Sequence, residues 1–292
     1  MKKAKPLLLF RPHLQADERF YDGYDPKFIS NKAWLLFHAC EHPEALKTFV
    51  SAVGGKPDDV DTEILQSLVA ELHFAVLHQF EVLFALMLGQ FQPLPHWVFL
   101  TEYKTAEIVK KAQSYVSGEY RAASNDLCST QAEFVSGSVY PGVNPPGELE
   151  PALSKSIDDI GWLIEEGAKR YLSSPEYNAY KHGLRVLPGA MTLMVRLREK
   201  NSEFAPVMSM SSSITYLERE DVEDGRGYAE VTKEVKAADA FNWIFAMASI
   251  AEIIKTIRLA RIRQTPVKIS TMAIDRDGLT RLRPTSKFRV SL

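Results

Sequence analysis

The sequence predicts a mainly α fold: a helical bundle with an inserted three-stranded antiparallel β-meander. The segment Thr62–Gly89 carries apolar side chains on nearly every side of a helix, the pattern of a central bundle helix whose Leu72, Leu83 and Leu86 belong to the core. Residues 191–198 alternate apolar and polar side chains with the period of a strand. Of the 292 residues, 46% are hydrophobic and 25% charged. These ordinary globular values allow a core that needs neither a disulfide nor a metal.

Capping residues, prolines and glycines predict where the helices begin and end. Residues 1–29 are expected to be an irregular N-terminal arm, and the first helix is expected to start at Ser30 as its N-cap. Pro43 favours a break at His42, because the residue before a proline avoids the helical conformation. The later helices are expected at residues 62–89, 105–123, 154–171 and 240–263, with a short helix that has Pro175 in its first turn.

Residues 124–153 contain Pro141, Pro145, Pro146 and three glycines and are expected to form a long loop. Loops of this length are uncommon inside a domain unless they are functional or disordered, so this one could link two domains. We prefer a single helical domain over residues 1–292, because the helices on either side are too apolar to stand alone.

The β insertion is expected at residues 189–236, with its second and third strands near 207–217 and 228–235. A helix then follows, and the chain ends in a basic C-terminal tail, residues 264–292, in which one or two short strands are expected.

Charge is distributed unevenly along the chain. From Lys255 to the end there are ten Lys or Arg against two Asp, while the net charge of the whole chain is −2. Such asymmetry can mark a surface for an anionic partner. Lys255, Arg258 and Arg261 recur every three residues along the last helix and are predicted to contact nucleic-acid phosphates. Alternatively, the basic end packs on the acidic body of its own molecule or of a second copy.

The cysteines and the apolar segments favour a soluble, cytoplasmic protein. Cys40 and Cys128 match neither a zinc nor a redox spacing, which indicates reduced thiols. The longest apolar stretch, Val69–Leu88, contains five polar side chains that would be costly in hydrocarbon, so a buried helix is expected there.

Two patterns resemble metal sites without completing one. Residues 38–42 have the HxxEH spacing of inverted zinc peptidases, but Pro43 interrupts the helix that this chemistry needs. Glu71, His78 and Glu81 share one face of the long helix and could be metal ligands or acid–base groups. A buried polar network is the alternative, and we expect no metal and no cofactor.

The most unusual segment is 176–185, where polar and basic side chains gather at the end of a short helix. Asn178 and His182 are four residues apart and so share a helical face, with Lys181 and Arg185 close by in sequence. Such a group of donors could bind a phosphate, with His182 able to transfer protons near neutral pH.

A structural role for the same segment is the alternative. In that case its polar groups cap the end of the helix and pair with acids such as Glu71 or Glu81.

A helical bundle with a late Asn-x-x-x-His motif resembles the HEPN superfamily, on Asn178 and His182 and over residues 60–123 and 154–263. Where that family has its arginine, this chain has Tyr177. The resemblance implies a metal-independent ribonuclease, or a related RNA-binding protein, in stress or phage defence, expected here as a dimer. It makes Asn178 and His182 catalytic, with Lys181 or Arg185 stabilising the charge on the phosphate.

The competing hypothesis is a non-enzymatic helical scaffold or adaptor that binds another protein. The basic end of the chain separates the two hypotheses. Cations that face an open groove favour nucleic acid, whereas cations packed against the acidic body favour the scaffold.

Overall fold

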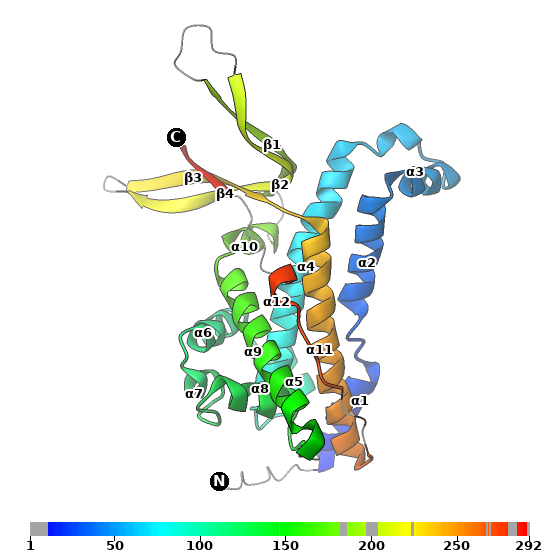
Figure 1. Cartoon of the computed structure of the whole chain (residues 1–292), viewed down its shortest axis with the longest axis vertical. Coiled ribbons are helices and arrows are strands. Elements are labelled where there is room, and N and C mark those ends of the chain that lie inside the picture. Colours follow the sequence, from blue (N-terminus) through cyan, green and yellow to red (C-terminus); the bar gives the residue numbers. More distant parts are fainter. Residues whose placement is uncertain are drawn as a thin grey trace. The chain divides into compact units, whose positions relative to one another are not determined.

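A computed structural model describes residues 11–145, 147–181, 186–196, 204–222, 225–266, 268, 270–279 and 285–290. The fold is mainly helical with a small antiparallel sheet, as predicted (Figure 1). The α-helices are α1 (Arg11–Gly23), α2 (Phe28–Glu41), α3 (Pro43–Ala52), α4 (Thr62–Gly89), α5 (His96–Glu102), α6 (Thr105–Val116), α7 (Tyr120–Ala123), α8 (Gln131–Val139), α9 (Glu150–Leu172), α10 (Pro175–Lys181), α11 (Ala237–Arg263) and α12 (Arg276–Leu279). The strands are β1 (Val186–Arg196), β2 (Phe204–Val222), β3 (Gly225–Glu234) and β4 (Thr285–Val290).

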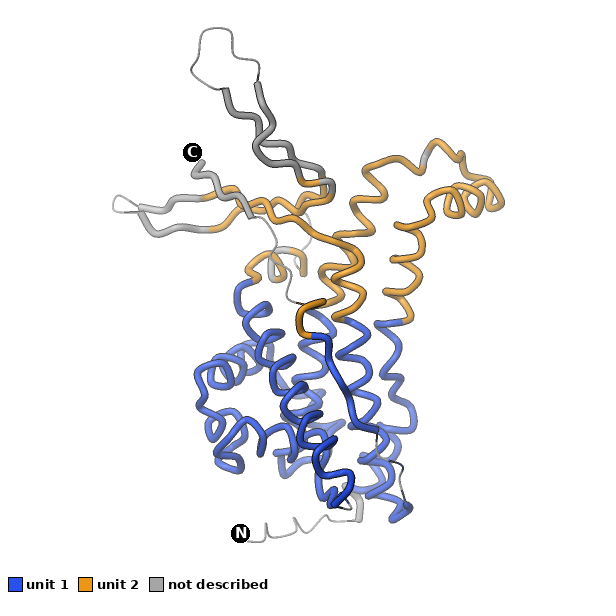
Figure 2. Tube along the Cα trace, viewed as in Figure 1, with its two compact units in different colours: residues 1–30, 77–173, 244–275 blue, residues 31–76, 174–243, 276–292 orange. Residues whose placement is uncertain are grey.

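The chain divides into two compact units, each assembled from separated segments (Figure 2). Unit 1 comprises residues 1–30, 77–173 and 244–275, and unit 2 comprises residues 31–76, 174–243 and 276–292. The long helices α4 and α11 contribute residues to both units. No unit boundary falls within residues 124–153, so this segment does not link the two units.

Two segments expected to be irregular contain helices, so those predictions were wrong. Within residues 1–29 lies α1, and within 124–153 lies α8 with the start of α9. The Thr130 side chain caps α8 by accepting a hydrogen bond from the Glu133 backbone at 3.1 Å, and Phe134 is fully buried. A helix this short shows little periodicity among neighbouring glycines and prolines, so the sequence pattern hid it.

Two helix ends differ from prediction. Ser30 lies inside α2, and Asp25 precedes the helix with a turn in which its carboxylate accepts a bond from the Lys27 backbone at 2.9 Å. The expected 105–123 helix stops at Val116, because Gly118 adopts a φ of +75° that only glycine takes at little cost. The predicted limits of α4 and the break before Pro43 are confirmed.

The sheet belongs to unit 2 and has the antiparallel order β1-β2-β3-β4. The three-stranded meander is confirmed, and β4 from the C-terminal tail adds a fourth strand beside β3. Tyr216, Ala229 and Val231 form a buried apolar cluster on β2 and β3. The sheet therefore has a core of its own.

Elsewhere in unit 2, α2 packs on the start of α11 through stacked rings of Phe37 and Phe241, whose centroids are 4.6 Å apart.

In unit 1, aromatic rings form the centre. Phe134 of α8 lies 5.0 Å from both Tyr115 and Phe91, measured between ring centroids. The last described part of unit 1 runs along α9, where the Met272 backbone donates to Ser156 Oγ at 2.8 Å.

Helix α4 is buried along most of its length. Leu72 and Leu83 are fully buried and Leu86 nearly so, as predicted for a central helix. Both α4 and α11 are long and apolar enough to cross a membrane by length and composition, but 89% of the apolar window of α4 is buried inside the protein. Burial of this kind is typical of a core helix, and cellular location stays a prediction.

We expect Leu83→Ala to lower the free energy of unfolding by roughly 2–5 kcal/mol, because it removes buried methyl groups and leaves a cavity. Ile64→Ala, on the partly exposed start of the same helix, is the control and should cost less than about 1.5 kcal/mol. Urea denaturation of the three proteins measures the difference. Equal losses for the two variants would contradict the central position of α4.

Candidate functional site

A fully buried carboxylate, Glu176, lies in the first turn of α10 in unit 2. It accepts hydrogen bonds from His73 Nε2 of α4 at 3.3 Å and from Lys233 Nζ of β3 at 3.1 Å. Tyr216 of β2 lies beside the Glu176–Lys233 pair, with its ring centroid 5.5 Å from the Lys233 ammonium. These four residues, which we call the Glu176 cluster, join a helix of the bundle, the short α10 and two strands of the sheet.

The electrostatics of the Glu176 cluster keep the carboxylate ionised. Burial alone would raise the pKa of Glu176, but the hydrogen bond from His73 and the positive charge of Lys233 outweigh it, so the pKa is lowered. The pKa of Tyr216 is raised, first by burial and then by the charge of Glu176. An ionised, fully bonded carboxylate is a poor proton donor or acceptor near neutral pH, so we interpret Glu176 as a positioning group for α10.

A second contact fixes the other end of α10. The Tyr180 hydroxyl donates to Glu71 of α4 at 2.7 Å, and its ring stacks on Phe74 at 4.0 Å between centroids. Burial, followed by the bond to Glu71, raises the pKa of Tyr180 to about 12. Lys32 of α2 also pairs with Glu71, at 3.3 Å. Helix α10 is therefore held to α4 at both ends, by Glu176 and by Tyr180.

The structure describes only part of the predicted catalytic group. Lys181 is exposed, and its ammonium lies 4.2 Å above the centroid of the Tyr177 ring. Asn178 belongs to α10, whereas His182 and Arg185 lie outside the described residues, so their catalytic roles stay predictions. The expected pairing of this segment with Glu71 is present, made by Tyr180.

The sequence interpretation missed the partners of Glu176. Lys233 is 57 residues away along the chain, and Tyr216 comes from another strand. The residues next to Glu176 in the sequence do not indicate that this acid is buried or which distant side chains contact it. Only the return of the chain through the sheet brings the three side chains together.

The three candidate ligands on α4 have different surroundings. Glu71 is paired as described, His78 is exposed, and the buried Glu81 accepts a bond from Thr105 at 3.2 Å. Over the part of the chain that the structure describes, no three His, Cys, Asp or Glu side chains lie together where they could hold a metal ion.

The predicted nucleic-acid contacts of α11 belong to unit 1, where two of them are bonded inside the protein. Lys255 Nζ donates to the Tyr24 carbonyl at 2.6 Å, and Arg258 forms an ion pair with the buried Asp17 of α1 at 2.7 Å. One turn later, Arg263 pairs with Glu18 at 2.8 Å and also with Asp22 of the same helix. Burial, followed by the charge of Arg258, lowers the pKa of Arg261.

Asp17 is the centre of a buried polar network in unit 1. Its other carboxylate oxygen accepts a bond from the His96 backbone at 2.6 Å, and the Tyr21 hydroxyl bonds to His96 Nδ1. Burial, followed by the charge of Arg258, lowers the pKa of His96 to about 3, so its ring is neutral and Nδ1 accepts a hydrogen bond from the Tyr21 hydroxyl. The network ties α1 to α5 and α11.

Glu176→Gln should lower the free energy of unfolding by about 3 kcal/mol near neutral pH, because it leaves the Lys233 charge without its carboxylate. The pKa of Glu176 is lowered by folding, so the carboxylate stabilises the protein above the unfolded pKa of 4.5 and this stabilisation is lost as the pH falls through the folded value. Urea denaturation at about pH 7 and about pH 3 should therefore show that the difference in free energy of unfolding between wild type and Glu176→Gln becomes smaller in acid. Glu63→Gln, at an exposed position of α4, is the control and should have the same free energy of unfolding as wild type at either pH. If the effect of Glu176→Gln did not change with pH, Glu176 would not be an ionised group stabilised by folding.

Arg258→Ala should destabilise the protein by roughly 3–5 kcal/mol, because Asp17 is buried and would lose its countercharge. Arg261→Ala, one turn along the same helix, should cost less than about 1 kcal/mol. If the main role of Arg258 were to contact phosphates, its loss would leave the unfolding curve nearly unchanged.

No protein-family model matches the chain, and the searches of curated proteins and of solved structures likewise find no match. The likeness to the HEPN superfamily therefore depends on Asn178 and His182 alone, and the function has to be argued from the geometry.

Proposed function

We propose that this protein is a helical adaptor that binds another protein through an exposed apolar surface on α2 and α3. This surface, the α2–α3 surface, consists of Trp34, Leu35, Phe49 and Val53, all in unit 2. The observation that carries the proposal is α3 itself. All ten of its residues are described, and none of them is buried.

An isolated helix of ten residues is marginal in water, and most helices are stabilised by packing an apolar face. The sequence of α3 has such a face, yet Phe49 remains 63% exposed and Val53, which follows the helix, 66%. On α2, Trp34 is 51% exposed and lies against the His38 ring, with 5.5 Å between centroids. Several large exposed apolar side chains on two consecutive helices can mark a protein interface.

The apolar area that Trp34 and Phe49 expose is large enough to support the binding of a partner. Covering Trp34 and Phe49 would remove on the order of 100 Å² of apolar surface from water at each residue. At about 25 cal/mol per Å², each contributes roughly 2.5 kcal/mol before the costs of association. Aromatic anchors of this kind commonly dominate the energy of an interface.

The basic part of α11 also supports an adaptor over an RNA-binding protein. Lys255, Arg258 and Arg263 bond to groups of α1 and the turn after it, so a phosphate could recruit them only by replacing these contacts. The scaffold hypothesis predicts that the basic end of the chain packs against acidic residues of the same molecule. RNA binding or cleavage at Asn178 and His182, and assembly into a dimer, stay separate predictions.

The test compares affinity purifications from the native source with three baits: wild type, Phe49→Gln and the control Ser51→Gln, which is exposed on another side of α3. Neither substitution changes the charge. A partner retained by wild type and Ser51→Gln but lost with Phe49→Gln should, once purified, bind wild type at least tenfold more tightly than the Phe49 variant. If all three baits retain the same proteins, the α2–α3 surface is not the binding site.

A further inference from the structure

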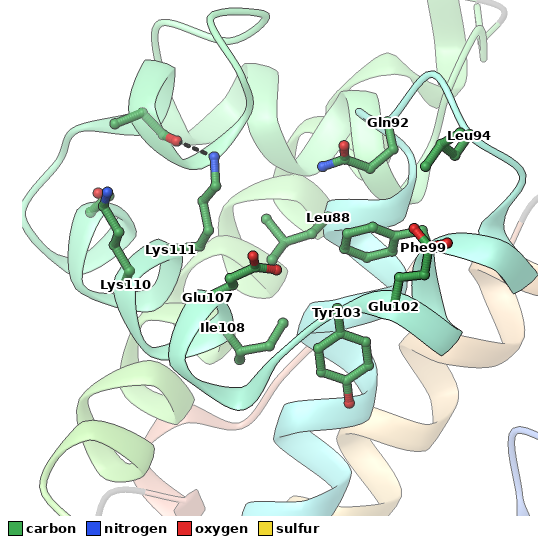
Figure 3. Close-up of a pocket in the computed structure, with 12 residues that line it drawn as sticks. Leu88, Gln92, Leu94, Phe99, Glu102, Tyr103, Glu107, Ile108, Lys110 and Lys111 are labelled. Carbon is green, nitrogen blue, oxygen red and sulfur yellow. Dashed lines mark hydrogen bonds between the residues drawn. The ribbon is translucent and has the colours of Figure 1, made fainter.

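A cavity of about 570 Å³ opens in unit 1 between the end of α4, helix α5 and helix α6 (Figure 3). Its apolar wall consists of Leu88, Phe99, Tyr103 and Ile108, of which Leu88 and Ile108 are buried in the core. The volume is within the usual range for small-molecule sites, which combine an apolar wall with a few polar groups. The polar groups therefore decide which ligand chemistry fits.

The polar side chains that line the cavity include two carboxylates, Glu102 and Glu107, and the Gln92 amide, together with two lysines and Ser114. In Figure 3 the Glu107 carboxylate and the Gln92 amide point into the space beside Leu88 and Phe99. Glu102 lies next to Phe99. A carboxylate close to an aromatic face is a combination that attracts cations, since both present negative potential.

The two lysines at the cavity do not reverse this preference. Lys111 donates to the Ala122 carbonyl, at the wall of the cavity, at 2.6 Å and to Asn125 Oδ1 at 2.7 Å, so these two acceptors hold its ammonium (Figure 3). Its pKa is lowered, mainly by burial and then by Lys110. Lys110 is exposed, as are Glu102 and Glu107, so solvent and salt screen these three charges alike, and the two carboxylates outnumber the one ammonium that is not held by an acceptor of the protein.

We propose that this cavity binds a small organic cation. Its ammonium or amidinium group pairs with Glu107, and its flat or aliphatic body lies on Phe99 and Leu88. An organic anion of the same size would place its charge against Glu107 and Glu102. The site uses none of the residues of the α2–α3 surface, so it stands or falls independently of the adaptor function.

Three probes of one shape test the proposal on the full-length protein: 2-phenylethylammonium, 2-phenylethanol and 3-phenylpropionate. Titrations followed by amide chemical shifts should show saturable binding of the ammonium probe with a Kd on the order of 1 mM, a usual strength for a fragment of this size. The alcohol and the carboxylate should bind at least several-fold more weakly. The shifted amides should belong to α5 and α6.

Glu107→Gln should weaken the ammonium probe by roughly fivefold, near the upper end of what an exposed ion pair contributes. Glu150→Gln, an exposed acid at the start of α9, should leave the Kd unchanged. Glu107 also accepts a bond from the Lys104 backbone at 3.4 Å, so its loss could perturb α6. Phe99→Leu therefore provides a second variant, which keeps an apolar wall, removes the aromatic face and should also weaken the ammonium probe.

Three results would overturn the proposal. Equal affinity for the ammonium and the alcohol would show that the carboxylates do not recognise charge. Tighter binding of 3-phenylpropionate would mean that the lysines dominate the cavity. The absence of saturable shifts with all three probes would mean that the cavity takes no small organic ligand of this kind.

Discussion

A helix of 28 residues with apolar side chains on nearly every side is unstable in water until other elements cover it, and α4 is such a helix. Its leucines are buried, but so are some of its polar residues, and a buried polar group without a partner is costly. His73 therefore bonds to Glu176, and Glu81 accepts a bond from Thr105. At His73 and Glu81, the neighbours of α4 thus supply the polar side chains that its burial requires.

Two helices are each anchored by a buried carboxylate. In unit 1, Asp17 anchors α1 through Arg258 and the His96 backbone, and in unit 2 Glu176 anchors α10 through His73 and Lys233. Taking a charge out of water is costly, so each anchor is stable only with all its partners present. In return, only one arrangement of the helix satisfies the bonds.

We expect function at the surfaces that this packing leaves exposed to solvent. Trp34 and Phe49 remain outside the core of unit 2, and the cavity beside Phe99 and Glu107 remains unfilled by side chains in unit 1. Of the three α11 cations predicted to contact phosphates, Arg258 neutralises a buried acid and Lys255 bonds to a backbone carbonyl.

The sequence by itself determined the helical class, the limits of α4 and the position of the β-meander, because periodicity and prolines act over neighbouring residues. It misjudged α1 and α8, whose few turns are stabilised by contacts with distant elements. It marked segment 176–185 as unusual but could not find the partners of Glu176, and it listed Arg258 as a ligand for phosphate. Only the tertiary structure decided these pairings, because Asp17 and Arg258 are 241 residues apart and charge in a sequence does not specify its partner.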